Sequence, residues 1–244
     1  MENAYLNIAK RDIKTAQLLF LSKRYPETVY YLQQACEKSI KSFGVGLGII
    51  TAKEAKSEVS HYTWKFLNFF YIYLKKYTDL THKDITKDKE DNNKNKKYLK
   101  EINNKFSSLN TDILTGELEF ILNKDKFNER LIKSITDIFG DSFLVNVSSM
   151  ILLNILTNRQ DVKDYIIPMF KLVYIGIMLS NHNQSSRYPF ELNNKPIEPR
   201  TYYNDENPLI KSFKLIEETM KASILVVEEA FANKDLFEIV EKQK

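Results

Sequence analysis

The chain has 244 residues, of which 43% are hydrophobic, and it contains only six glycines and six prolines. This composition supports a hydrophobic core and favours helices over a β-sandwich or a β-barrel. The net charge of +4 is compatible with an anionic partner but does not require one.

The single cysteine, Cys36, excludes a disulfide within the chain and fits a reducing cytoplasm. The N-terminus has no signal-peptide pattern, and no segment reaches about 18 uninterrupted apolar residues. We therefore expect a cytoplasmic protein with no membrane segment.

Two helices are predicted at the N-terminus, over residues 3–22 and 24–48. The short link between them predicts an antiparallel hairpin. Glycines at 44, 46 and 48 are expected to end the second helix. Apolar residues recur along this helix at spacings of three and four, which places on one stripe Val29, Leu32, Cys36, Ile40, Phe43 and Leu47. On this stripe, Cys36 is expected to be a small buried core residue and not a reactive thiol.

The polar face of the second helix carries Gln33, Gln34, Glu37, Lys38 and Lys41. Glu37 and Lys41 are four residues apart, in the order that favours a pair on a helix. Lys38 and Lys41 are candidates for phosphate contacts. The alternative is that they are solvated or paired with Glu37.

A third helix, rich in aromatic residues, is predicted from near His61, which either caps that helix or belongs to a site. Residues 79–105 are mostly Lys, Asp, Asn and Glu, so they predict a solvated loop. Residues 106–160 return to helical patterning. We interpret 79–160 as an insertion, consisting of a polar loop and a layer of accessory helices.

The C-terminal part of the chain predicts a helix over 161–182 and a long helix over 206–233. Between them, prolines at 189, 196 and 199 are expected to keep the loop out of a helix. No strand is predicted. The fold class is therefore all-α.

Two motifs stand in order along this helical pattern. The second helix reads Gln33-Gln34-Ala35-Cys36-Glu37-Lys38-Ser39-Ile40-Lys41, and the later loop reads Ser186-Arg187-Tyr188-Pro189. With His61 between them, this order resembles the HEPN domain, the helical domain named for higher eukaryotes and prokaryotes nucleotide-binding. The resemblance covers roughly residues 3–75 and 162–233. It implies an up-and-down helical bundle formed by 1–78 and 161–244, with 79–160 inserted.

The resemblance also implies a homodimer. Many HEPN proteins are metal-independent ribonucleases of toxin–antitoxin or defence systems, and others partner a minimal nucleotidyltransferase. The nuclease members carry an arginine four to six residues before a histidine. Here no histidine follows Arg187, and His182 precedes it by five residues.

RNA cleavage without a metal needs a base for the 2′-hydroxyl and a cation for the phosphorane, which histidine and arginine supply. His182 and Arg187 are therefore the candidate catalytic pair, with Asn181 beside them. The alternative is that Arg187 pairs with Glu37 and that His182 is a surface residue at a helix C-terminus.

The first hypothesis is a homodimer that binds RNA or a nucleotide and is a candidate ribonuclease. Tyr188 either stacks on a base or belongs to the core. The second hypothesis is a non-catalytic module that docks a partner such as a nucleotidyltransferase. No metal or cofactor site is predicted. The candidate binding residues are Lys38, Lys41, Tyr188, Asn181, Glu37 and His61.

Overall fold

The computed structural model describes residues 2–59, 63, 65–66, 69–70, 114–116, 118–119, 160–180 and 182–232, with backbone alone at 160–167. The predicted loop over 79–105, most of the predicted helices in 106–160 and most of the predicted third helix lie outside these residues. The division into a bundle and an insertion therefore stays a prediction.

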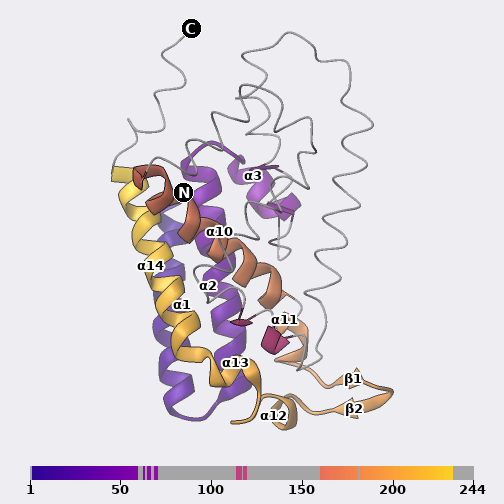
Figure 1. Ribbon diagram of the computed structural model, residues 1–244. Helices are drawn as coiled ribbons and strands as arrows, with labels where there is room; N and C mark the ends of the chain where they lie inside the picture. The colour runs from indigo at the N-terminus through magenta and orange to yellow at the C-terminus, as the bar shows by residue number, and fades with distance from the viewer. Residues whose placement is uncertain are drawn as a thin grey trace, which may run out of the picture.

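Four long helices make up most of the described part of the chain and alternate in direction (Figure 1). They are α1 (Glu2–Leu21), α2 (Tyr25–Gly46), α10 (Gln160–Ser180) and α14 (Phe213–Ala232). Phe20 stacks on Phe213 with ring centroids 4.1 Å apart, and Lys10 donates a hydrogen bond to Glu228. The later contact on α1, at Phe20, meets the start of α14, and the earlier one, at Lys10, meets a residue near the end of α14. The two helices are therefore antiparallel neighbours. The predicted all-α, up-and-down bundle is confirmed for this part of the chain.

The C-terminus of α2 is capped by backbone hydrogen bonds, and the predicted glycine cluster supplies the backbone conformation that they need. Gly48 has φ of 68°, a left-handed conformation that favours glycine. The Ile49 N–H donates to the Gly44 carbonyl at 2.9 Å, and the Gly48 N–H donates to the Val45 carbonyl at 3.2 Å. This pair of bonds is the Schellman motif. The prediction that these glycines end the helix is therefore confirmed.

Short elements follow α2 and lie between α10 and α14. The first two are α3 (Ala52–Glu54) and a π-helical turn, η1 (Ala55–Val59). The others are α11 (His182–Ser185), α12 (Pro199–Tyr202) and α13 (Pro208–Lys211). Pro199 occupies the first position of α12, where a missing N–H costs nothing. The expectation that this proline excludes a helix was wrong for that reason.

A β-hairpin protrudes from the bundle beside α11 and α12 (Figure 1). It joins β1 (Phe190–Leu192) to β2 (Lys195–Ile197), with Phe190 opposite Ile197. Asn193 and Asn194 link the strands with φ of 53° and 60°. Two left-handed residues form the turn that suits a two-residue hairpin, and asparagine tolerates this conformation. The expectation of no strand was therefore wrong here.

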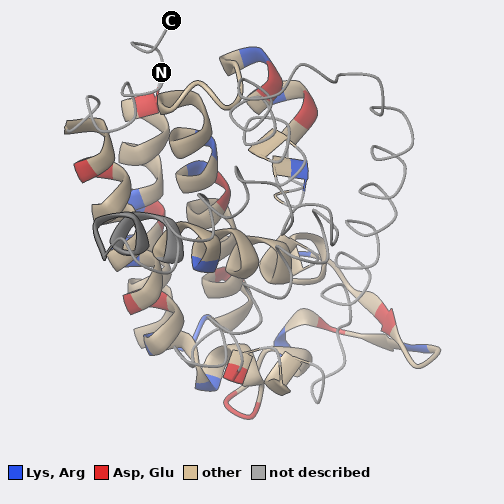
Figure 2. Ribbon diagram, turned by 45° about the horizontal axis from the view of Figure 1, so that its top comes forward, with Lys and Arg blue, Asp and Glu red and all other residues tan. Residues whose placement is uncertain are grey.

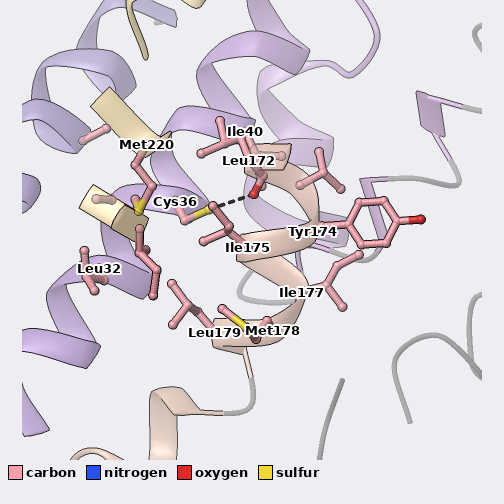
Figure 3. Packing of buried hydrophobic residues seen from close by; sticks show 14 of the residues in the cluster. Leu32, Cys36, Ile40, Leu172, Tyr174, Ile175, Ile177, Met178, Leu179 and Met220 are labelled. Carbon is pink, nitrogen blue, oxygen red and sulfur yellow. Dashed lines mark hydrogen bonds between the residues drawn. The ribbon is translucent and has the colours of Figure 1, made fainter. Parts of the chain in front are cut away.

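The core is built around α2, which contacts α1, α10 and α14 (Figures 1 and 3). Cys36 lies at the crossing with α10, fully buried, and its Sγ donates to the Leu172 carbonyl at 3.0 Å. Burial raises the pKa of the Cys36 thiol well above its ordinary value. The predicted role of Cys36 as a buried core residue is confirmed. Among the described helices, none is long and apolar enough to cross a membrane.

Helix α10 approaches α2 closely at Gly176. A Cβ placed there would lie 2.8 Å from Ile40 Cδ1 and 3.1 Å from Cys36 Sγ and Thr63 Oγ1. These distances are shorter than ordinary van der Waals contacts. Only glycine therefore lets the two helices pack at this separation.

We predict that Gly176→Ala lowers the free energy of unfolding by about 1–2 kcal/mol, measured by urea denaturation. Alanine favours a helix over glycine by about 1 kcal/mol, but overpacking a core costs about 1–3 kcal/mol. Gly116→Ala is the control, because a Cβ there meets nothing within 4 Å. Equal or greater stability of Gly176→Ala would contradict the packing argument.

Candidate functional site

The polar face of α2 is buried in the bundle. Glu37 is 1% exposed and Lys41 is 6% exposed. Lys41 Nζ donates to Glu37 Oε1 at 2.6 Å, and Gln33 Nε2 donates to the other carboxylate oxygen at 3.4 Å. The alternative for Lys41, that it is solvated or paired with Glu37, is therefore confirmed in its second form.

Lys38 and Asp12 extend this polar network toward α1. Lys38 Nζ lies 3.3 Å from Glu37 Oε1 and donates to Gln34 Oε1 at 2.7 Å. Asp12 is also buried, and burial raises the pKa of its carboxyl while the charges of Lys38 and Arg11 oppose that rise. Lys38 and Lys41 thus contact internal carboxylate or amide oxygens. Their predicted role as phosphate contacts is not tested by this geometry.

We predict that Glu37→Gln lowers the free energy of unfolding by about 3 kcal/mol, because it removes the anion that Lys41 contacts inside the core. The double variant Glu37→Gln/Lys41→Met should recover part of this loss, since it removes the buried cation as well. Urea denaturation of the wild type, both single variants and the double variant gives the coupling energy. Additive losses would show that the pair is not coupled.

His182 is buried in α11 and not at the surface, so that part of the sequence prediction was wrong. Its Nδ1 lies 2.7 Å from Tyr203 Oη, and the Ser185 hydroxyl lies 2.8 Å from the same oxygen. The ring also packs near Tyr202, with centroids 6.4 Å apart. The turn of α11 directs the imidazole toward α12 and the residue that follows it, which encloses the side chain.

Burial lowers the pKa of His182 to about 4. No residue that the structure describes forms a hydrogen bond with the Nε2 atom, and a charge on the protonated ring would be buried. At neutral pH, His182 is therefore an uncharged core residue that positions Tyr203 and the α11 turn.

We predict that the free energy of unfolding falls as pH falls from about 6.5 to about 4, by up to about 3 kcal/mol from His182 alone. The folded-state pKa lies below the unfolded value, so only the unfolded chain binds this proton in that window. The measurement is urea denaturation across the window for the wild type and His182→Gln.

The difference between the two pH profiles isolates His182, because Asp12 and the other titrating groups are present in both proteins. Parallel profiles would contradict the assigned burial of a neutral imidazole.

Arg187 and Tyr188 follow α11 and are exposed. Arg187 Nε donates to the Asn183 carbonyl at 3.1 Å. The guanidinium carbon lies 5.0 Å from the centroid of the Tyr30 ring and 5.3 Å from that of Tyr188. Tyr30 in turn meets Tyr31 edge-on, with centroids 5.3 Å apart. We call this series of four side chains, Tyr31, Tyr30, Arg187 and Tyr188, the Tyr–Arg ladder.

Arg187 belongs to the ladder and not to the ion pair with Glu37 that the sequence analysis gave as the alternative. Tyr30 lies two helical turns before Glu37 on α2, so the arginine contacts the same helix at a different level. The ion pair was the wrong prediction because Glu37 is enclosed by the core, whereas Arg187 remains at the surface. The sequence analysis did not single out Tyr30. The signal that could have identified it is the pair of adjacent tyrosines, Tyr30 and Tyr31, just before Gln33 and Gln34.

Within one chain, the two residues of the predicted catalytic pair have different surroundings. His182 is buried against Tyr203, whereas Arg187 is exposed against Tyr30. Asn181 and His61 lie outside the described residues. Of the candidate residues, Glu37, Lys38 and Lys41 form one internal network, and Arg187 and Tyr188 form the exposed end of the ladder.

Charges of both signs are mixed along the described helices in the view of Figure 2. Several of the surface charges are also paired, as in Arg24 with Glu27 at 2.6 Å and Lys211 with Glu206 at 2.5 Å. The residues that the structure describes therefore do not form a broad basic surface in this view.

Comparison with known protein families gives a match over the N-terminal helices. The family model of the HEPN domain matches residues 3–58, which run from α1 through most of η1. No curated protein and no solved structure gives a significant match. The match contains the whole of α2 with its glutamine motif and its buried network. The resemblance to the HEPN domain is thus confirmed over residues 3–58, and it indicates a function related to nucleotides or RNA.

Proposed function

We propose that this protein binds RNA or a nucleotide at the surface formed by Arg187 and Tyr188. The observation that carries the proposal is an exposed arginine held in place by a backbone carbonyl and two aromatic rings. Arginine presents a planar fork of donors that matches phosphate, and it stacks on aromatic faces. The HEPN match over residues 3–58 supports the same class of ligand.

Under this proposal the protein binds its ligand without using His182 as a catalytic base. A general base must come within hydrogen-bond reach of the proton that it removes. The imidazole of His182 is fully buried, and its Nδ1 contacts Tyr203. Binding is therefore favoured over cleavage by the pair of His182 and Arg187.

We place this activity in a toxin–antitoxin or defence setting and in a homodimer, as the HEPN resemblance implies. The alternative proposal is a non-catalytic module that docks a minimal nucleotidyltransferase. The two proposals differ at Arg187. RNA binding requires its guanidinium, whereas docking of a protein through other surfaces does not.

We predict that Arg187→Ala weakens RNA binding about tenfold and makes the salt dependence shallower, by about one unit in the slope of log K against log salt. The measurement is fluorescence anisotropy of a labelled oligoribonucleotide at several salt concentrations. Arg11→Ala is the matched control, because Arg11 is an exposed arginine on α1 and changes the net charge equally.

Equal effects of the two substitutions would show that only net charge matters. If the wild type binds no RNA and no nucleotide, the proposal is contradicted and the docking alternative is favoured. The same samples, incubated in EDTA and resolved on a gel, test for cleavage. Metal-independent cuts that are lost in His182→Gln would contradict the non-catalytic role assigned to that residue.

A further inference from the structure

The Tyr–Arg ladder runs from the core to solvent. Tyr31 packs against the hydrophobic core, whereas Tyr188 is 59% exposed at the other end. Each neighbouring pair along the ladder is separated by 5.0–5.3 Å, a spacing typical of aromatic and cation–π contacts. The series therefore ends on the ring of Tyr188, which contacts the Arg187 guanidinium and is open to solvent.

The donors of Arg187 are only partly used. Nε is engaged by the Asn183 carbonyl at 3.1 Å. Within the described part of the chain, no carboxylate forms an ion pair with this guanidinium. Its terminal nitrogens, Nη1 and Nη2, carry four further N–H groups and are held beside Tyr188. An anion that reaches this position would meet an arginine that no carboxylate of the described residues neutralises.

The arginine is supported by two elements of the bundle, α11 and α2. Asn183 belongs to α11, which is anchored by the contacts of His182 and Ser185 with Tyr203. Tyr30 belongs to α2, the central helix of the core. The guanidinium is thus positioned from two elements that are distant in sequence, and this arrangement exists before any ligand binds.

A fixed arginine beside an exposed aromatic ring matches the two parts of an unpaired nucleotide. The face of a base stacks on an aromatic ring, and the adjoining phosphate accepts bonds from a guanidinium. In a duplex, both faces of each internal base are already stacked on neighbours, so only the phosphate would remain available. The ladder therefore suits single-stranded RNA better than double-stranded RNA.

We propose that the Tyr–Arg ladder is a binding site for an unpaired nucleotide of single-stranded RNA, with the base on Tyr188 and a flanking phosphate on Arg187. This inference rests on the proposed RNA-binding function and specifies its ligand class. Because the ladder offers a stacking face and a phosphate donor, and no group on it is assigned to read a base edge, the site accepts different bases.

The test uses the full-length protein and three labelled probes of equal length: an unstructured oligoribonucleotide, the same strand annealed to its complement, and an abasic ribose-phosphate oligomer. Dissociation constants are measured by anisotropy for the wild type, Tyr188→Leu and Tyr188→Phe. Leu225→Ala on α14 is the matched control, because Leu225 is exposed to a similar extent, at 57%. Thermal melting checks that each variant is folded.

We expect the single strand to bind more tightly than the duplex. Tyr188→Leu should weaken single-strand binding about tenfold, as removal of one stacking ring does, and Tyr188→Phe should weaken it less because the ring remains. Binding of the abasic probe should not change in Tyr188→Leu. Leu225→Ala should bind as the wild type does.

Single-strand binding that survives Tyr188→Leu, or equal binding of strand and duplex, would overturn the ladder as the nucleotide site while leaving the RNA-binding function intact. Failure of the wild type to bind any of the three probes would instead remove the RNA-binding function, and the ladder site with it. Loss of abasic binding in Tyr188→Leu would show that the ring acts on the backbone and would also overturn the assignment.

Discussion

The buried carboxylate of Glu37 is the constraint on which the rest of the structure depends. A charge removed from water must be compensated by partners close by, or the fold loses several kcal/mol. Lys41, Lys38 and Gln33 supply that compensation from the same helix, one turn away or adjacent. Asp12 of α1 lies beside this group, so the two helices must pack in one register. The motif of α2 therefore contributes to the interior of the bundle.

Gly176 and Cys36 determine how closely α10 packs against α2. Close approach of α10 depends on a residue without a Cβ, and the thiol of Cys36 fits the space that remains, bonded to the Leu172 carbonyl (Figure 3). With α1 packed on one side and α10 on another, the part of α2 that reaches the surface includes its first turns. Tyr30 lies there, which explains why the loop after α11 meets α2 at that level and not at Glu37.

The long elements could be predicted from the sequence because their signals are local. A 3.6-residue apolar period and a glycine-rich terminus define α2, and similar patterns define α1, α10 and α14. The hairpin could not be predicted, since three-residue strands show too little alternation and the turn depends on the backbone angles of Asn193 and Asn194. Burial of His182 and Glu37 also escaped prediction. Whether a polar residue is covered depends on which element packs over it, and periodicity does not contain that information.

The segment from His182 to Tyr188 has a buried half, which begins at His182, and an exposed half, which contains Arg187 and Tyr188. The two halves are connected by the hydrogen bond from Arg187 to the Asn183 carbonyl. The buried half fixes the turn through Tyr203, and the exposed half presents Arg187 on a carbonyl of the same turn. Ordering a long side chain on binding costs about 0.5–1.5 kcal/mol, so an arginine that is held before the ligand arrives avoids that loss. The burial that withdraws His182 from solvent also anchors the turn whose Asn183 carbonyl holds Arg187.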